Sequence, residues 1–243
     1  RNHMSMARQV CSWLQDTAPD IQNLTEEMIR EGLREQEARG YAGWTVMHRL
    51  TKTRLLLDRA VELGMINANP AREIRRKQPK LAARRRILED DEIRQLLEIS
   101  MHYRHWINGG LPTVVRLGLY AGMRDEEMIW AQWTWLNSRR RVLSVQQSVC
   151  ELTGETWIPK DQEARDLGVK EELVSYLAEE KKRLRTAGLL GPFLLPAGGS
   201  RRSGFKEKPL SESAPQAAFR KMIQAAGMDP AITIYSLRHT YCT

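Results

Sequence analysis

A strongly basic run near residue 80 divides this sequence into two parts. The segment 70–86 sets the single acid Glu73 against eight basic residues, namely Arg72, Arg75, Arg76, Lys77, Lys80, Arg84, Arg85 and Arg86. Like charges so close together repel one another and keep a segment extended unless an anion neutralises it. We therefore predict a linker at 70–86 between two domains, at 5–69 and 87–243. Phosphate groups could neutralise this linker, or it could simply be solvated, and the run alone favours neither.

The first part has the pattern of an all-helical domain, with helices expected at 6–14, 25–39 and 43–64. One face of the third helix is apolar at helical spacing and consists of Val46, Leu50, Leu57 and Val61. The opposite face is basic and carries His48, Arg49, Lys52 and Arg59. That face could bind phosphates, although for this helix taken alone a solvated surface is the preferred interpretation.

The second part mixes helices with short strands. Helical segments are expected to begin near Glu89, Pro112, Lys170 and Ser213. Between them the period of hydrophobicity shortens toward two, which predicts strands at 141–149, 156–159 and 165–169. The expected fold class is therefore α+β and mainly helical: a small all-α domain followed by a mixed α/β domain with a small antiparallel sheet.

Composition restricts the partners and the chemistry. The 38 Lys and Arg residues against 30 Asp and Glu give a net charge of +8, which favours a polyanion such as DNA, although RNA or an acidic membrane face would also fit. The apolar runs are short, so none approaches the ~20 residues that span a bilayer. The three cysteines form no Cys-x-x-Cys pair and fit a reducing cytosol. We expect a cytoplasmic protein with no metal, because His102 and His105 alone make too small a ligand set.

Two arginine-containing segments carry the strongest functional signal. Residues 121–127 read Ala-Gly-Met-Arg-Asp-Glu-Glu, and residues 234–240 read Ile-Tyr-Ser-Leu-Arg-His-Thr. Cleaving a phosphodiester without a metal needs charge stabilisation at the phosphate, a proton for the leaving oxygen and a nucleophile. Arginine suits the first task because its planar fork donates two parallel hydrogen bonds, and lysine can supply the proton. Taken alone the first segment is weak, since an exposed arginine paired with a neighbouring acid explains it. The second is a stronger signal, because Arg-His-Thr is unusual at the start of a helix, but it is not unique.

In order and separation the two segments resemble the arginine boxes of the tyrosine recombinases. Between them, Trp157-Ile158-Pro159-Lys160 and then Arg165 are similar to that family's hairpin lysine segment. The resemblance implies that Arg124 and Arg238 clamp the scissile phosphate. It implies that Lys160 is the general acid for the departing 5′ oxygen.

The same resemblance implies roles for three neighbouring residues. Glu127 would buttress the site rather than react, and His239 would donate a supporting hydrogen bond. This sequence has Tyr235 where the family most often has His. A phenol, with an ordinary pKa of about 10, is a poor base at neutral pH, so this departure bears on proton transfer.

The first part of the chain is similar to the core-binding domain of phage-type integrases. The resemblance implies DNA binding through basic residues of the third helix and the linker, namely His48, Arg49, Lys52, Arg59, Arg76, Lys77, Arg84 and Arg85. We expect no part of this sequence to form the arm-type domain that many phage integrases carry in front. Residues 1–4 are interpreted as a cloning remnant.

Together these resemblances imply a site-specific DNA recombinase of the phage-integrase type. It would act as a homotetramer on duplex core sites, through a 3′-phosphotyrosine intermediate and without a cofactor. Accessory DNA-bending or excisionase proteins are among the implied partners, the bacterial nucleoid is the expected location, and no membrane is involved.

The family's nucleophilic tyrosine follows a further His or Trp beyond the second box. A chain ending at Thr243 is therefore expected to bind DNA without cleaving it. We reject Tyr235 and Tyr241 as nucleophiles because they lie in the second box and directly after it, rather than on the separate later helix that the family uses. The alternative function is a non-catalytic DNA-binding regulator derived from an integrase, and a type IB topoisomerase fits the domain order and size less well.

Overall fold

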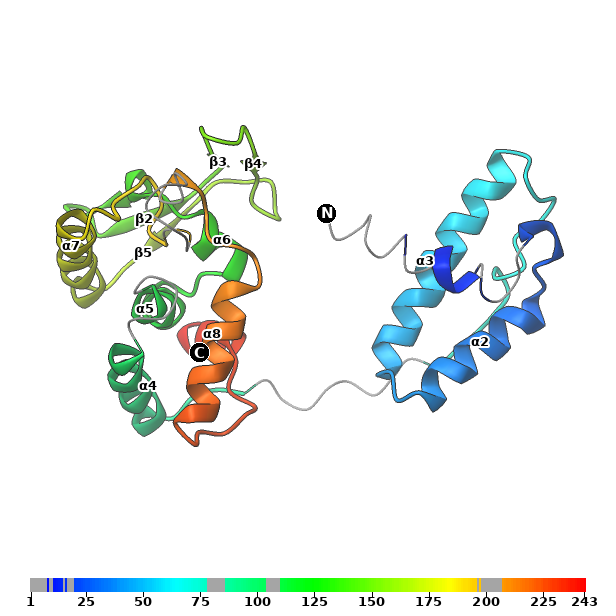
Figure 1. The fold of residues 1–243 in the computed structure, drawn as a ribbon, viewed down its shortest axis with the longest axis horizontal. Coiled ribbons are helices and arrows are strands. Elements are labelled where there is room, and N and C mark those ends of the chain that lie inside the picture. Colours follow the sequence, from blue (N-terminus) through cyan, green and yellow to red (C-terminus); the bar gives the residue numbers. More distant parts are fainter. Residues whose placement is uncertain are drawn as a thin grey trace. The chain divides into compact units, whose positions relative to one another are not determined.

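Two units make up the chain, Arg1–Ala83 and Arg84–Thr243 (Figure 1). The computed structural model describes residues 8, 11–14, 16, 20–77, 86–103, 110–195, 197 and 207–243. Four of the basic residues and histidines named above, Lys80, Arg84, Arg85 and His105, therefore lie outside the described residues.

The first unit is helical throughout its described part. Residues 11–14 are helical, and they are followed by the 3-10 helix η1 (Ile21–Asn23), α2 (Glu26–Ala38) and α3 (Gly43–Glu62). The hydroxyl of Thr25 accepts the N–H of Met28 at 3.3 Å, which caps α2. The helices predicted at 25–39 and 43–64 are thus confirmed.

The core of the first unit lies between α2 and α3. Val46, Leu50 and Leu57 of α3 are fully buried with Ile29 and Leu33 of α2, as the apolar spacing of α3 predicted. Val61, expected on the same face, is only half-buried, because it lies in the last turn of the helix.

The first unit extends beyond residue 69, where the sequence analysis began the linker. Ala71 and Ile74 are fully buried in the core of this unit. Arg54 of α3 donates to the carbonyl of Ala71 at 3.1 Å and to that of Ile74, and the Asn69 side chain accepts the N–H of Ala71 at 2.8 Å. The sequence analysis judged this segment by its many basic residues and so overlooked Ala71 and Ile74, which a single turn of the chain directs to the core.

The second unit contains the remaining elements. Its described helices are α4 (Asp90–His102), α5 (Leu111–Ala121), α6 (Asp125–Trp130), η3 (Trp133–Trp135), α7 (Glu171–Thr186), α8 (Ala214–Ala225) and α9 (Ile234–Tyr241). Its described strands are β1 (Leu136–Asn137), β2 (Val142–Val145), β3 (Ser148–Val149), β4 (Thr156–Trp157) and β5 (Arg165–Gly168). The predicted α+β class with a small antiparallel sheet is confirmed.

The strands form two small antiparallel sheets rather than one. The order β1-β2-β5 gives a three-stranded sheet in which Val145 lies opposite Arg165, and β3 pairs with β4 so that Ser148 lies opposite Trp157. The single strand expected at 141–149 is therefore interrupted, because β3 leaves the first sheet to form a hairpin with β4. Gly154 has a φ of +68° in the turn of that hairpin, a conformation that favours glycine.

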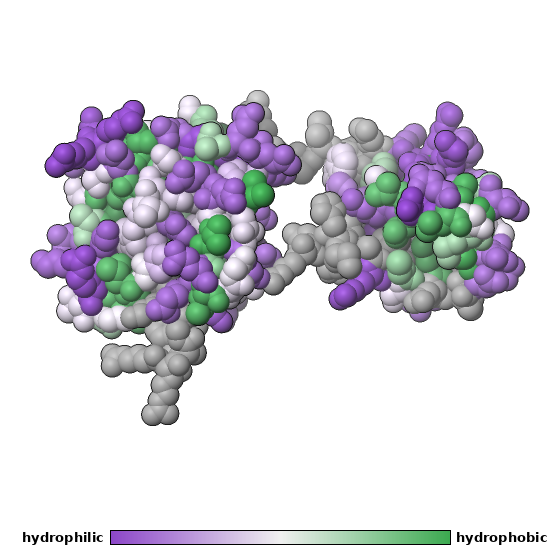
Figure 2. Space-filling model, turned by 90° about the horizontal axis from the view of Figure 1, so that it is seen from above, coloured by the Kyte–Doolittle hydropathy of each residue, from purple (hydrophilic) through white to green (hydrophobic). Residues whose placement is uncertain are grey.

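The core of the second unit centres on α5, which is buried on nearly every side. It packs closely on α9, because a Cβ at Gly118 would lie 2.7 Å from the Cβ of Leu237. On the face in Figure 2, hydrophobic residues of this unit occur as scattered spots among hydrophilic ones. In the part of the chain that the structure describes, none of the helices has the length and apolar content needed to cross a membrane.

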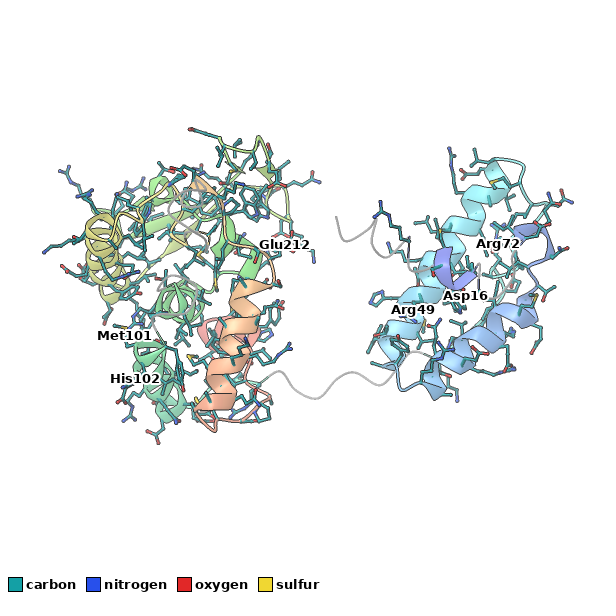
Figure 3. All side chains as sticks on the ribbon, in the orientation of Figure 1. Asp16, Arg49, Arg72, Met101, His102 and Glu212 are labelled. Carbon is teal, nitrogen blue, oxygen red and sulfur yellow. The ribbon has the colours of Figure 1, made fainter. Side chains whose placement is uncertain are left out.

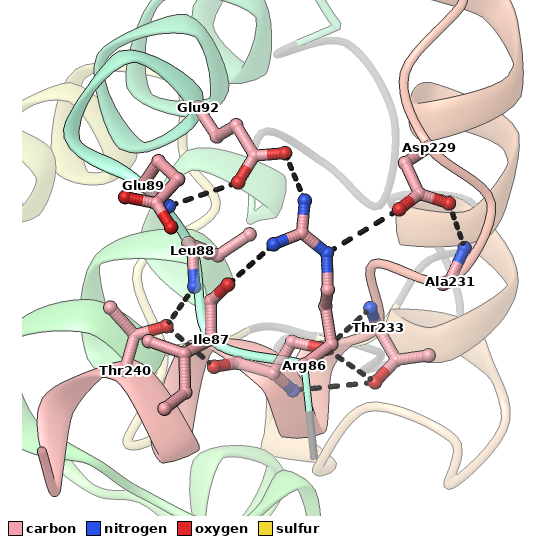
Figure 4. A network of polar contacts seen from close by, with 10 residues as sticks. Arg86, Ile87, Leu88, Glu89, Glu92, Asp229, Ala231, Thr233 and Thr240 are labelled. Carbon is pink, nitrogen blue, oxygen red and sulfur yellow. Dashed lines mark hydrogen bonds and ion pairs between the residues drawn. The ribbon is translucent and has the colours of Figure 1, made fainter. Parts of the chain in front are cut away.

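A polar network fixes the entry into the second unit (Figure 4). Arg86, counted above as a linker residue, forms ion pairs with Glu92 and with Asp229, the latter at 3.4 Å. The N–H of Leu88 donates to the hydroxyl of Thr240 in α9 at 2.9 Å. Arg86 therefore belongs to the second unit, and its charge is balanced there.

Candidate active site

The first arginine box begins where α5 ends. Gly122 is left-handed, with a φ of +56°, and a Cβ at this position would lie 2.2 Å from the ring of Tyr241. Only glycine meets both conditions without strain. The reversal of the chain at Gly122 places Arg124 at the N-cap of α6, next to the second box.

A buried carboxylate holds Arg124 in place. Glu127 is 1% exposed, and its Oε2 accepts the backbone N–H of Arg124 at 2.8 Å. Its Oε1 accepts Nη1 of Arg124 at 3.0 Å and Nη2 of Arg165 at 2.7 Å. One negative charge is therefore shared by two guanidinium groups that come from α6 and β5.

The hairpin lysine lies in a tight turn beside this cluster. The N–H of Gln162 donates to the carbonyl of Pro159 at 2.8 Å, so Lys160 and Asp161 occupy the centre of the turn. Oδ2 of Asp161 accepts a second hydrogen bond from Nη1 of Arg124, at 2.9 Å. That bond, and then the charge of Arg124, hold the pKa of Asp161 below its ordinary value.

The electrostatics of Arg124 follow from the same contacts. Partial burial lowers the pKa of Arg124, but the hydrogen bond to Asp161 and the charge of Glu127 outweigh that effect and leave the pKa raised. Arg124 therefore stays charged, and its Nη1 already donates to two carboxylates.

Several of the residues selected from sequence meet in one hollow of about 180 Å³. Arg124 and Glu127 line it from α6, Lys160 from the turn and Tyr235 from α9, together with Asp125, Glu126 and Trp157. Two cationic groups and a phenol thus converge on a space that is open to solvent. A phosphate in this hollow would meet charge stabilisation and a proton donor together.

The second box joins the first through the backbone of Gly122. Thr233 caps α9 by accepting the N–H of Ser236 at 3.3 Å, and Arg238, one turn further along, donates to the carbonyl of Gly122. Tyr235 is 50% exposed, with its ring edge-on to His239 at 4.6 Å between centroids. The Tyr241 hydroxyl, in contrast, donates to the carbonyl of Gly168 at 3.4 Å.

The basic residues of the first unit that are expected to bind DNA differ in their side-chain contacts and in their exposure. Arg49 of α3, labelled in Figure 3, lies over the ring of Tyr41 at 4.2 Å. Arg59 forms an ion pair with Glu62 at 2.7 Å, and Arg76 forms one with Glu37. The others differ in exposure: His48 and Lys77 are exposed and Lys52 is half-buried. Parts of this surface are thus partly neutralised.

Sequence reasoning missed the contact of Asp161 with Arg124 and the role of Arg165 in the cluster around Glu127. The only signal for Asp161 was its position directly after Lys160. Among the described residues no group of three or more His, Cys, Asp or Glu could hold a metal ion. His102 is exposed near the end of α4 (Figure 3).

Solved structures of DNA-bound integrases share this arrangement of elements. A lambda integrase fragment, solved as a dimer bound to a core site, matches with a TM-score of 0.69 and 17% identity over 99% of this chain and 81% of its own. A Tn1549 transposon integrase bound to a circular-intermediate DNA matches with a TM-score of 0.70 and 14% identity over 100% of this chain and 80% of its own. The chain has the integrase fold.

This result confirms the fold that the resemblance to tyrosine recombinases implied. A lambda integrase tetramer bound to a Holliday junction also matches, with a TM-score of 0.68 and 17% identity over 99% of this chain and 63% of its own. No family model and no curated protein sequence matches the chain. The integrase fold is therefore carried by the structure rather than by sequence identity.

Proposed function

We propose that this protein is a site-specific DNA recombinase of the phage-integrase type. The observation that carries the proposal is the shared hollow at which Arg124, Lys160 and Tyr235 meet, with Arg238 bonded to the same turn of chain through Gly122. These are the residue types that metal-free phosphodiester cleavage requires, on an integrase fold.

In the proposed reaction the two arginines bind the nonbridging oxygens of the scissile phosphate. Their charge stabilises the transition state as a tyrosine hydroxyl releases its proton to solvent, its oxygen attacks phosphorus and the bond to the 5′ oxygen breaks. Lys160 gives its proton to that departing oxygen, and the 3′ phosphate stays joined to the tyrosine. Tyr235 donates a hydrogen bond to the phosphate, His239 beside its ring donates a supporting one, and Glu127 holds Arg124 in place.

The first unit is proposed to be the core-binding domain. His48 is exposed on α3, Arg49 and Lys52 of the same helix are half-buried, and Lys77 is exposed beyond it. Lysine and arginine that neutralise phosphates release counterions, so affinity should fall steeply as the salt concentration rises. We propose that the protein assembles as a tetramer on two sites, as the lambda integrase neighbour does on a Holliday junction.

The test has two arms. The first titrates a labelled duplex with the 243-residue chain at several salt concentrations, and we expect binding with a steep inverse dependence on salt. The second incubates the chain with a nicked suicide substrate and looks for a covalent adduct. We expect no adduct at Tyr235 or Tyr241, whereas a chain that includes the nucleophilic tyrosine should form one.

The outcomes separate the proposal from its main alternative. A chain that includes the nucleophilic tyrosine, binds duplex DNA specifically and never forms the adduct would be a non-catalytic DNA-binding regulator. Binding to no duplex, or binding that does not change with salt, would contradict both functions.

A further inference from the structure

Arg165 has no role in the reaction outlined above, yet it contacts the buried carboxylate of the site. Its Nη2 lies 2.7 Å from Oε1 of Glu127, the same oxygen that accepts Nη1 of Arg124. Arg165 itself is not among the residues that line the hollow. Among the described residues its Nη1 is buried without a hydrogen-bond partner, so Glu127 is the group that fixes this side chain.

We propose that Arg165 is a positioning residue: by sharing the carboxylate of Glu127, it leaves the positive charge of Arg124 available to a DNA phosphate. The inference deepens the proposed function, on which its consequence for DNA binding rests. It means that β5, rather than either arginine box, supplies the cation that shares the carboxylate of Glu127.

The charges of the cluster support this role. Arg124 and Arg165 contribute two positive charges, and Glu127 and Asp161 contribute two negative ones, so the resting cluster is balanced. When a phosphate takes the place of the exposed Asp161, Arg124, Arg165 and Glu127 remain. Together they carry one uncompensated positive charge, which faces the phosphate. Without Arg165, Glu127 would neutralise Arg124 completely, and a buried carboxylate does not give up its only cation readily.

The geometry explains why a distant residue is needed. Glu127 is 1% exposed and binds both the backbone N–H and the guanidinium of Arg124, so it sets the position of that side chain. A carboxylate that holds an arginine also cancels its charge. A second cation on the same carboxylate oxygen removes this conflict, and Arg165 reaches it from β5, which pairs with β2.

The chain offers a matched control in α7. Glu180 is 2% exposed and accepts from Nη2 of Arg183 at 2.5 Å and from its Nε at 2.9 Å, while Arg183 is 29% exposed. Glu127 with Arg165 has nearly the same burial, at 1% and 28%. Arg183→Gln therefore reports what the loss of such a pair does to stability alone, since neither residue lines the hollow.

The first measurement is the affinity for a 20-base-pair duplex of mixed sequence across a salt series. Arg165→Gln should reduce the salt slope by about 0.9, equivalent to about eightfold weaker binding near ~0.1 M salt. The double variant Arg165→Gln with Glu127→Gln restores the charge balance and should regain part of the lost affinity, since the Gln amide keeps only one of the two acceptors that hold Arg124. Arg183→Gln should bind as the wild type does.

A recovery in the double variant is the decisive result, because a direct phosphate contact or a purely structural role would leave that variant as weak as Arg165→Gln or weaker. If Arg165→Gln does not fold, Arg165→Lys carries the test. Lysine keeps the charge, and Arg165 contacts Glu127 through Nη2 alone, so we expect wild-type binding. An eightfold loss in Arg165→Lys, or no loss in a folded Arg165→Gln, overturns the proposal.

The second measurement needs no DNA, so it separates this inference from the proposed function. The cations near Asp161 are Arg124, Arg165 and Lys160, and together they lower the pKa of its carboxyl. Titration by NMR should show the pKa of Asp161 rising in Arg165→Gln and falling again in the double variant. An unchanged titration overturns the inference even if duplex DNA binds. If the wild-type chain does not bind DNA but the pKa of Asp161 changes in the variants as expected, only the recombinase assignment is contradicted.

Discussion

The two arginines at the centre of the candidate site are held in opposite ways. Arg124 donates to two carboxylates, Glu127 and Asp161, whereas Arg238 donates to the backbone carbonyl of Gly122. A carbonyl orients a guanidinium without cancelling its charge. Within the described part of the chain no carboxylate lies within ion-pair distance of Arg238, so the two boxes supply one uncompensated and one compensated cation.

The difference shows that the same residue type serves two tasks in one site. Arg238 presents its charge as soon as α9 packs against α5, because its orientation comes from backbone contacts. Arg124 presents its charge only after Asp161 has left it. Since Asp161 directly follows Lys160, the exchange of a carboxylate for a phosphate also concerns the turn that carries the proposed general acid.

The largest expected effect comes from removing either cation. In a chain that carries the nucleophilic tyrosine, Arg124→Ala or Arg238→Ala should each remove a transition-state contact of about 3 kcal/mol, so that strand cleavage slows about a hundredfold or more. The rate of adduct formation on a nicked suicide substrate measures this. If Arg124→Ala cleaves at the normal rate, the assignment of the first box is wrong and the recombinase proposal fails with it.

Lys160 provides the next test, because it lies beside Asp161 but is expected to act on a different atom. Lys160→Ala should leave DNA binding largely intact and slow cleavage. A substrate with a 5′-bridging sulfur, whose leaving group needs no proton, should recover most of the lost rate. A variant that stays equally slow on the sulfur substrate would show that Lys160 is not the general acid.

Local signals were sufficient for most of the helices. Thr25 marked the start of α2, and the apolar spacing of α3 correctly placed Val46, Leu50 and Leu57 in the core. Such signals depend on residues only a few positions apart, which a single sequence displays directly.

Contacts between distant residues were not predictable in this way. The division of 141–149 into β2 and β3 depends on pairing with β5 and β4, which no local pattern specifies. The bond between Arg238 and the carbonyl of Gly122 joins positions 116 residues apart. Ala71 and Ile74 were hidden in a basic run, because their burial depends on α3 rather than on their neighbours in sequence.

A smaller effect is expected from Asp161, which distinguishes Arg124 from Arg238 most directly. Asp161→Asn removes the carboxylate that competes with a phosphate for Arg124, so duplex binding should strengthen by several-fold, with a steeper salt dependence. Asp166→Asn is the control, because that carboxylate accepts from Ser144 rather than from the cluster. Equal gains in both variants would mean that only net charge had changed.

The same contact has a defined pH dependence. Because Arg124 lowers the pKa of Asp161, the ion pair is fully formed above the ordinary carboxyl pKa and is lost as the pH falls through the lowered value. The NMR shift of the Asp161 carboxyl should therefore move only at acidic pH, and Arg124→Gln should return it toward ordinary behaviour. A titration in Arg124→Gln that matches the wild type would show that the pair does not form in solution.

The smallest effect is expected at Tyr235, which shares the hollow with Arg124 but belongs to the box of Arg238. A phenol can donate a hydrogen bond to a phosphate oxygen but cannot readily accept a proton at neutral pH, whereas imidazole can do both. In a chain that carries the nucleophile, Tyr235→His should therefore cleave as fast as the wild type or faster. Tyr235→Phe, which keeps the ring but removes the hydroxyl, is the matched control and should be slower. Since the ring of Tyr235 already lies edge-on to His239, a Phe variant as fast as the wild type would show that the residue acts only by packing, and that the phosphate depends on the two arginines and Lys160.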